Sequence, residues 1–168
     1  MKYVDTLVTF SEIPDEICLC INISNCPYHC SGCHSQYLWE NVGYELTSEE
    51  LKRLIDENPG ISCVCFMGGT ESDVLRLLYT TCVRCKVKTA WYTGQTNIPD
   101  YPVLSYLDYV KVGPYIKELG PLTSKTTNQK LYRVEHVSVP GFGEGQDITT
   151  DAVTLHDITF RFWEEKII

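Results

Sequence analysis

The chain has 168 residues, of which 43% are apolar and 11% are aromatic. This is enough hydrophobic material for one core and too little for two ordinary domains. Lysine and arginine number 14 against 22 aspartates and glutamates, a net charge of −8, and no stretch gathers the basic residues as binding to a phosphate backbone requires. The sequence therefore disfavours nucleic-acid binding, and its short, strand-sized apolar runs predict a cytoplasmic protein without a membrane segment.

The nine cysteines are the unusual feature of the composition, and an odd number cannot all pair within one chain. Cys18 and Cys20, and likewise Cys63 and Cys65, alternate within apolar runs. Disulfide scaffolds instead spread their cysteines through the loops of smaller secreted chains. We therefore expect a reduced compartment, in which the cysteines are small core residues or metal ligands.

Strand and helix patterns alternate along the first 135 residues. Strand patterns cover residues 16–23, 61–67, 86–92, 107–112 and, more weakly, 130–134. The sequence Thr47-Ser48-Glu49-Glu50 predicts a capping box that begins a helix, which Asn58-Pro59-Gly60 ends. A second helix is predicted over residues 72–82, where Val74, Leu77, Leu78 and Cys82 form an apolar stripe.

The repeated strand–helix–strand order favours a parallel sheet. A complete eight-stranded α/β barrel needs about 250 residues, so this chain is too short for one. We predict an α/β fold that is a short, incomplete (open) barrel with mostly parallel strands, or else a small doubly wound sheet. Functional groups are then expected at the carboxyl ends of the strands.

We expect one domain over residues 1–168, with a core at 16–135 and a C-terminal extension at 136–168. The stretch 139–147 is rich in glycine and predicts a loop. Beyond this loop, Ile158–Phe162 alternates as an edge strand does. We expect that strand to pair with the segment Tyr3–Phe10.

Directly after the first predicted strand comes Asn25-Cys26-Pro27-Tyr28-His29-Cys30-Ser31-Gly32-Cys33-His34, with three cysteines spaced C-x3-C-x2-C. Such a loop can turn three thiolates toward one centre, and thiolates favour iron-sulfur clusters or zinc. Three ligands would leave one iron of a [4Fe-4S] cluster open to another molecule. Alternatively, His29 or His34 completes a Cys3His zinc site, or the three thiols bind nothing.

Glycine-containing motifs follow two further predicted strands. Gly68-Gly69-Thr70-Glu71 comes after one strand, and Tyr92-Thr93-Gly94 ends the next. Glycine lets backbone atoms approach a ligand closely, which is one interpretation of both motifs. The other interpretation is ordinary turn chemistry, with Thr70 capping a helix together with Asp73 and Gly94 supplying a positive φ. At the first motif both interpretations can hold together.

In its cysteine spacing the loop resembles the radical S-adenosylmethionine (SAM) enzymes. The wider series of motifs, from Asn25–His34 through Met67-Gly68-Gly69, Tyr92-Thr93-Gly94 and Thr127-Asn128-Gln129, resembles the activating proteins of anaerobic ribonucleoside-triphosphate reductase. This resemblance covers about residues 16–135. It implies that the open barrel is of the radical SAM type.

The resemblance also implies a chemistry. Cys26, Cys30 and Cys33 would hold a [4Fe-4S] cluster whose fourth iron binds SAM. Reductive cleavage of SAM would give a 5′-deoxyadenosyl radical, which takes a hydrogen atom from a glycine of the partner, anaerobic ribonucleotide reductase. A low-potential donor such as flavodoxin or ferredoxin would supply the electron.

Further residues receive SAM contacts by the same resemblance, namely Gly68, Gly69, Thr70, Glu71, Thr93, Gly94, Lys111 and Tyr28. The sequence departs from the family at two places. Thr70 stands at an acidic position, so that either Thr70 or Glu71 would hold the methionyl end. Val112 stands where the family has aspartate, which leaves Lys111 as the polar neighbour or as a solvated lysine.

Two alternatives to this function stay open. One is an activase of another glycyl-radical enzyme, although those are expected to be longer. The other is a non-enzymatic interaction domain with a Cys3His zinc site, which has no use for glycine motifs at successive strand ends. Thr127-Asn128-Gln129 either contacts SAM or the partner, or forms a plain turn.

Overall fold

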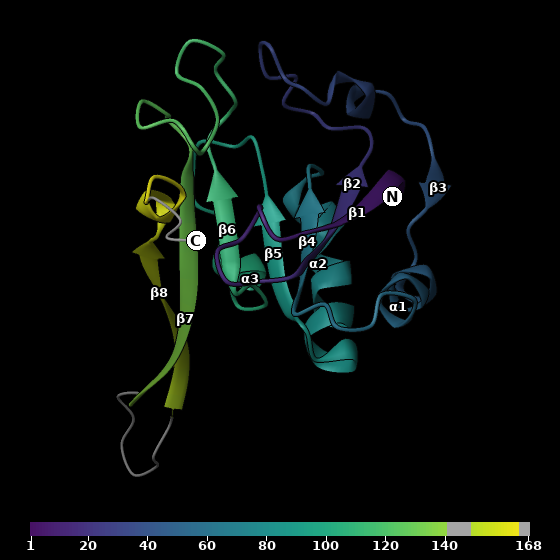
Figure 1. Cartoon of the computed structure of the whole chain (residues 1–168). Helices are drawn as coiled ribbons and strands as arrows, with labels where there is room; N and C mark the ends of the chain where they lie inside the picture. Colours follow the sequence, from purple (N-terminus) through teal and green to yellow (C-terminus); the bar gives the residue numbers. More distant parts are fainter. Residues whose placement is uncertain (141–148, 165–168) are drawn as a thin grey trace.

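A computed structural model describes residues 1–140 and 149–164. These residues form one mixed sheet of eight strands in the order β3-β1-β2-β4-β5-β6-β7-β8 (Figure 1). The strands are β1 (Lys2–Thr9), β2 (Cys18–Ile23), β3 (Tyr44–Glu45), β4 (Cys63–Met67), β5 (Lys88–Tyr92), β6 (Tyr109–Val112), β7 (Lys130–Pro140) and β8 (Thr149–Asp157).

The helices within the described residues are short. The α-helices are α1 (Ser48–Asp56), α2 (Glu71–Tyr79) and α3 (Tyr101–Leu104). Single 3-10 turns form η1 (Gln36–Trp39) and η3 (Thr159–Phe162), and a π-helical segment, η2 (Thr80–Cys85), continues α2. No helix in this part of the chain combines the length and the apolar character that a membrane crossing needs.

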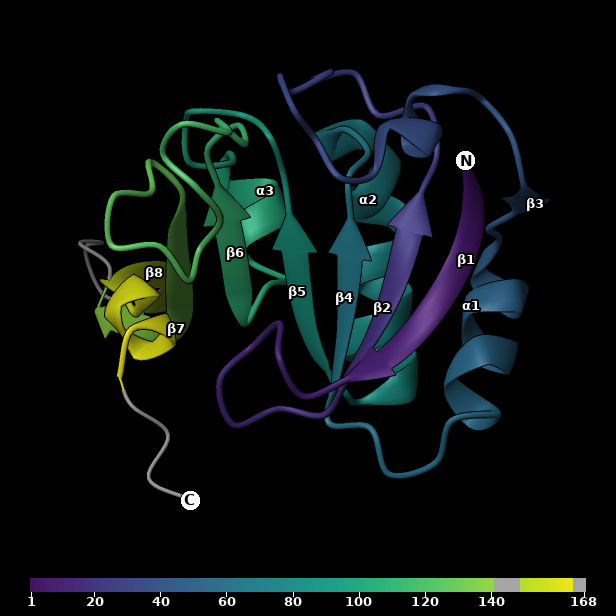
Figure 2. The same cartoon turned by 45° about the horizontal axis from the view of Figure 1, so that its top comes forward.

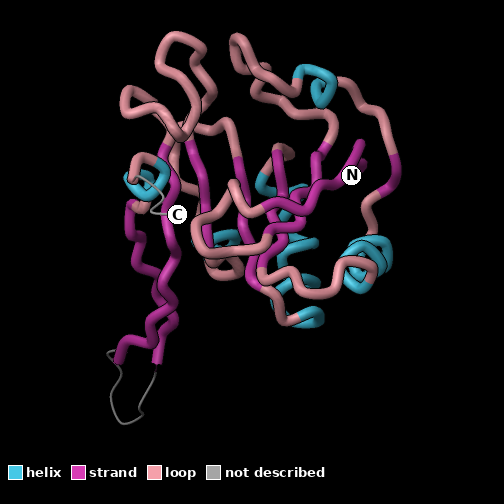
Figure 3. Tube along the Cα trace, viewed as in Figure 1, coloured by secondary structure: helices cyan, strands magenta, loops and turns pink. Residues whose placement is uncertain are grey.

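The centre of the sheet is parallel. Strands β2, β4, β5 and β6 pair in parallel, and α1, α2 and α3 provide the three crossovers between them, as Figure 3 makes visible along the chain. Helices α2 and α3 lie behind the sheet in Figure 2. The carboxyl ends of the four parallel strands therefore meet at one edge of the sheet.

The prediction of an incomplete radical SAM-type barrel with mostly parallel strands is wrong. Strands β1, β3, β7 and β8 all pair antiparallel with their neighbours, so the structure is a mixed sheet with few helical residues. The helical crossovers stop at β6, because the segment between β6 and β7 contains no helix. The chain then returns antiparallel as β7, which also pairs antiparallel with β8.

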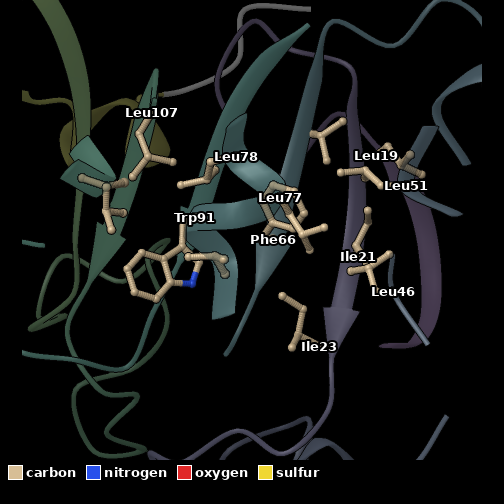
Figure 4. Close-up of a cluster of buried hydrophobic side chains, with 14 of the residues drawn as sticks. Leu19, Ile21, Ile23, Leu46, Leu51, Phe66, Leu77, Leu78, Trp91 and Leu107 are labelled. Carbon is tan, nitrogen blue, oxygen red and sulfur yellow. The ribbon is translucent and has the colours of Figure 1, made fainter. Parts of the chain in front are cut away.

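The two faces of the sheet carry two cores. One face packs against the helices through large apolar side chains, including Leu19, Ile21, Phe66, Leu77 and Trp91 (Figure 4). The other face carries smaller residues, including the predicted core cysteines Cys18, Cys20, Cys63 and Cys65, all of which are buried. Loop residues such as Ile13 and Leu122 cover this second face.

Both predicted helices are present. The side-chain oxygen of Thr47 accepts a hydrogen bond from the Glu50 amide and caps α1. Thr70 and Asp73 form a full capping box at the start of α2, which confirms the turn interpretation of Thr70. The predicted α-helix over 72–82 ends at Tyr79, and the chain continues as η2; the side chain of Cys82 lies outside the described residues.

Two predictions concern the last part of the chain. The predicted edge strand Ile158–Phe162 is wrong, because Thr159–Phe162 is the 3-10 helix η3. Thr159 begins this turn and accepts a hydrogen bond from the Leu131 amide at 2.9 Å, which fixes it beside β7. The partner strand predicted for Tyr3–Phe10 is instead β2. Most of the predicted glycine-rich loop, residues 141–147, lies outside the described residues.

Candidate functional site

The three clustered cysteines lie in a loop that leaves β2 at the carboxyl edge of the sheet (Figure 1). Two backbone hydrogen bonds close the base of this loop, from the Asn25 amide to the Glu40 carbonyl at 3.0 Å and from the Cys26 amide to the Leu38 carbonyl at 2.9 Å. Within the loop, the Cys33 amide donates to the Cys30 carbonyl at 3.0 Å. The loop is thus folded back toward the strand ends.

This fold places the three cysteines in one pocket, here called the cysteine pocket, with a volume of about 150 Å³. The loop contributes Cys26, Tyr28, Cys30, Cys33, Leu38 and Trp39 to its walls. The ends of β4, β5 and β6 and the segments that follow contribute Met67, Gly68, Tyr92, Thr93, Gly94, Lys111 and Tyr115. Eight of the predicted site residues therefore meet in a single pocket.

Gly68 brings the end of β4 against the first cysteine. Its φ is +94°, in the region that favours glycine, and an added Cβ would lie 3.7 Å from the Cys26 Sγ and 3.3 Å from the Ile23 carbonyl oxygen. The Gly68 carbonyl accepts a hydrogen bond from the Trp91 indole at 2.7 Å. The backbone of this turn is therefore fixed directly beside a pocket thiol.

Gly94 is required because a side chain here would collide with Tyr28, not because the backbone needs a positive φ. Its φ is not among the positive values of the chain, so the interpretation of Gly94 as a positive-φ turn residue is wrong. An added Cβ would instead meet Cβ and Cγ of Tyr28, each at 2.7 Å. The absence of a side chain at Gly94 therefore lets the Tyr28 side chain pack against the end of β5.

Tyr28 also begins a short polar chain at the rim of the pocket. Its hydroxyl donates to the Gln95 side-chain oxygen at 3.3 Å, and the Gln95 amide nitrogen donates to the Glu71 carboxylate at 3.1 Å. Burial raises the pKa of the Tyr28 phenol, so the phenol stays protonated and able to donate. These hydrogen bonds tie the cysteine loop to the start of α2.

Lys111 is buried, with 8% of its surface exposed, so the interpretation as a solvated lysine is wrong. Its ammonium group donates to the Gly113 carbonyl at 3.0 Å and the Thr93 carbonyl at 3.3 Å. Burial lowers its pKa to about 8, while the pocket cysteines favour the charged form. Lys111 therefore places a positive charge in the wall of a pocket that three cysteines also line.

The thiols of the pocket are unpaired and interact electrostatically. Burial raises the pKa of Cys26, and the nearby Cys30 and Cys33 raise it further, whereas backbone hydrogen bonds from Tyr28 and Gly69 lower it. The Ser35 amide donates a hydrogen bond to the Cys33 sulfur at 3.4 Å. Three free cysteines in one pocket, two of them beside backbone donors, are a donor set that soft metals and clusters bind.

The remaining predicted SAM contacts do not line the pocket. Gly69, Thr70 and Glu71 are not among its lining residues, since Thr70 is engaged in the capping box and Glu71 in the hydrogen bond to Gln95. Asn128 and Gln129 donate to the Pro114 and Gly113 carbonyls. The Thr127-Asn128-Gln129 motif thus braces the segment after β6, which carries the pocket residue Tyr115.

Sequence reasoning missed the aromatic and apolar walls of the pocket, Leu38, Trp39, Met67 and Tyr115. No local spacing pattern could have found them, because they lie in three separate segments. Trp39 stacks on His29 with ring centroids 4.7 Å apart, and Tyr115 lies 4.9 Å from the His34 ring. The two histidines considered as zinc ligands are therefore packed against aromatic rings.

Among the described residues, no three histidine, cysteine, aspartate or glutamate side chains converge as a single bound ion requires. A [4Fe-4S] cluster makes a different demand, because each cysteine binds its own iron and the sulfurs stay a cluster's width apart. The three cysteines that line the cysteine pocket are a donor set of the kind that holds such a cluster.

The family comparison identifies the class of cofactor. The model of the 4Fe-4S single cluster domain family matches residues 17–135, which is well over half of the chain and includes the cysteine pocket. The chain belongs to this family. It is an iron-sulfur protein, and its cofactor is a [4Fe-4S] cluster. Among curated proteins and among solved structures, none matches the chain.

Proposed function

We propose that this iron-sulfur protein is a radical SAM activase that generates the glycyl radical of anaerobic ribonucleotide reductase. The observation that carries the proposal is the shared pocket. Three cysteines of one loop face strand-end glycine motifs that come from separate parts of the sequence. A cluster that only passed electrons would have no need of a pocket beside its cysteines.

When bound, the cluster and SAM would supply the chemistry: one electron from a flavodoxin- or ferredoxin-like donor cleaves the sulfonium to methionine and a 5′-deoxyadenosyl radical, which takes a hydrogen atom from a partner glycine. The protein's own contribution is to hold both groups and exclude water. Cys26, Cys30 and Cys33 are the proposed ligands, and their number leaves one iron without a protein ligand.

The strand ends supply the proposed SAM contacts. Gly68, Thr93 and Gly94 line the same pocket as the cysteines, and the two glycines can offer only backbone groups. Tyr28 adds an aromatic face that Gly94 makes room for. These groups can accept from an amino group, donate to a ribose or carboxylate, and pack on a base.

Lys111 has the charge that a carboxylate needs. Its ammonium group lies in the pocket wall and is held there by two carbonyl oxygens. We propose that it attracts the carboxylate of the methionyl group. Gly69 is proposed to act through the backbone hydrogen bond to Cys26, and Thr70 and Glu71 by holding the turn that presents Gly68.

The test is reductive SAM cleavage, measured as 5′-deoxyadenosine formed by anaerobically purified, dithionite-reduced protein. Cys26→Ser, Cys30→Ser and Cys33→Ser are each expected to lose nearly all activity, while Cys85→Ser, outside the pocket, keeps it. A wild-type protein with a full cluster that forms no 5′-deoxyadenosine would contradict the proposal.

The partner is tested separately, by mixing the protein with anaerobic ribonucleotide reductase, SAM and reductant. A glycyl-radical EPR signal on the reductase is expected, and its absence while SAM is still cleaved would reject this partner. Activation of a different glycyl-radical enzyme under the same conditions would identify that enzyme as the partner instead.

A further inference from the structure

A second hollow, here called the outer hollow, adjoins the cysteine pocket and has a volume of about 420 Å³. The two share Cys33, Ser35, Met67, Tyr92, Lys111 and Tyr115 as wall residues. The outer hollow continues to the other side of this wall, where Glu12 of the β1–β2 loop, Gln129 and Phe162 of η3 line it. A molecule in the outer hollow therefore lies next to the cysteine pocket.

Lys111 and Glu12, the two charged residues that line the outer hollow, differ in their hydrogen bonds. Lys111 donates to two backbone carbonyls. The Glu12 carboxylate receives no hydrogen bond from residues 1–140 or 149–164, and only the charge of Lys111 acts on it favourably. Burial raises the pKa of Glu12, which is the mark of a carboxylate that has lost water without gaining a donor.

Glu12 is nonetheless held in place. Its backbone carbonyl accepts a hydrogen bond from the Tyr92 hydroxyl, and Tyr92 is itself buried in the wall between the two spaces. The neighbouring Ile13 is fully buried in the second core. A fixed, half-buried carboxylate that lacks a donor is complementary to a cationic group that enters from outside.

We propose that the outer hollow receives an extended peptide segment of the partner protein, and that Glu12 pairs with an arginine or lysine side chain of that segment. This inference rests on the proposed function, which requires a peptide backbone next to the cysteine pocket. The apolar walls provided by Met67, Leu122 and Phe162 suit the remainder of a peptide better than they suit a small hydrophilic cation. Glu12 is then a specificity-determining residue.

The test uses synthetic peptides and an equilibrium readout that does not depend on SAM cleavage. Four acetylated and amidated heptapeptides each carry one glycine in an alanine background, with arginine one or two positions before or after it. Their counterparts carry citrulline, which has nearly the shape of arginine without its charge. Binding to the cluster-loaded protein is measured by calorimetry.

At least one arginine peptide is expected to bind wild-type protein at least about tenfold more tightly than its citrulline counterpart, as loss of one charged hydrogen bond predicts. Glu12→Gln should abolish this preference. Glu118→Gln removes the same charge from an exposed loop outside the hollow, and this variant should keep the preference for the arginine peptide. Loss of the preference in Glu118→Gln as well would assign it to net charge and overturn the proposal.

Two further outcomes would overturn the proposal: no arginine peptide binds more tightly than its counterpart, or Glu12→Gln binds the arginine peptide as wild type does. SAM cleavage without peptide, measured in parallel, distinguishes a failure of the proposed function from a failure of the role given to Glu12. Wild-type protein that cleaves SAM but shows no charge preference rejects only the role of Glu12. Protein that shows the preference but cleaves no SAM rejects the proposed function and leaves the cationic subsite standing.

Discussion

At the residue scale, the site depends on close contacts that a single side chain would disturb. Gly94 lies against Tyr28, and Gly68 lies against Cys26. Each glycine sits at the end of a different strand, and each touches a different residue of the cysteine loop. The pocket is therefore formed where the loop and the strand ends fit together, not by the loop alone.

Replacing Gly94 tests this fit. In Gly94→Ala the new Cβ would lie 2.7 Å from Tyr28, so the Tyr28 side chain must move, at a cost of about 1–3 kcal/mol in the free energy of unfolding. We expect SAM affinity, measured by calorimetry, to fall at least about tenfold. Gly60→Ala, where the added carbon meets no atom within 4 Å, should leave SAM affinity unchanged. Unaltered affinity in Gly94→Ala would refute the role given to Tyr28.

A second residue, Glu16, governs stability at the opposite end of the sheet. Its buried carboxylate accepts hydrogen bonds from Lys88, Ser62 and Tyr109. Burial opposes ionisation, but these three donors outweigh it and hold the pKa of Glu16 below its usual value. The network joins the start of β2 to β5 and β6.

A carboxyl group whose pKa is lowered by folding stabilises the protein above its unfolded pKa, and this stabilisation is lost as the pH falls through the folded pKa. Glu16→Gln should therefore lower the free energy of unfolding by about 1–3 kcal/mol at pH 7. The difference from wild type should shrink below the unfolded pKa of about 4.5. Guanidinium unfolding followed by tryptophan fluorescence measures both, and a difference independent of pH would show that the charge of Glu16 is not responsible.

At the scale of elements, local signals in the sequence were sufficient for α1 and for the start of α2. Their N-caps, Thr47 and Thr70, depend on side chains within three residues, so that sequence alone predicts them. The antiparallel direction of strands β1, β7 and β8 was not predicted, because the direction of a strand depends on the segment that connects it to the strand beside it. Between β6 and β7, glycine, proline and threonine indicate a loop, and a loop leaves the direction of the following strand open.

Thr70 separates a capping role from a contact with SAM. Thr70→Ala removes the cap of α2 and should lower the free energy of unfolding by about 1 kcal/mol, while Thr70→Ser keeps the hydroxyl and nearly all of the stability. Thr70 does not line the cysteine pocket and acts only by holding the turn before α2. Thr70→Ser should therefore leave SAM affinity unchanged, and Thr70→Ala should weaken it by less than about tenfold. A tenfold weaker SAM affinity in Thr70→Ala at full folding would instead establish a direct contact.

At the scale of the whole molecule, the sequence predicted which residues gather but not the sheet that gathers them. Cys26, Gly68, Thr93 and Lys111 meet because β2, β4, β5 and β6 are parallel and end at one edge. That part of the prediction needed only the strand–helix order. The aromatic walls of the pocket and Glu12 could not be predicted, because they come from loops whose paths are set by tertiary contacts.

The most direct test of the central claim is a measurement of iron, acid-labile sulfide and zinc in anaerobically purified protein, with EPR spectra of the reduced form before and after SAM is added. Our account predicts about four iron and four sulfide per chain, and a cluster signal that SAM changes. A signal that SAM leaves unchanged would contradict the open iron, and one zinc without sulfide would contradict the cluster itself.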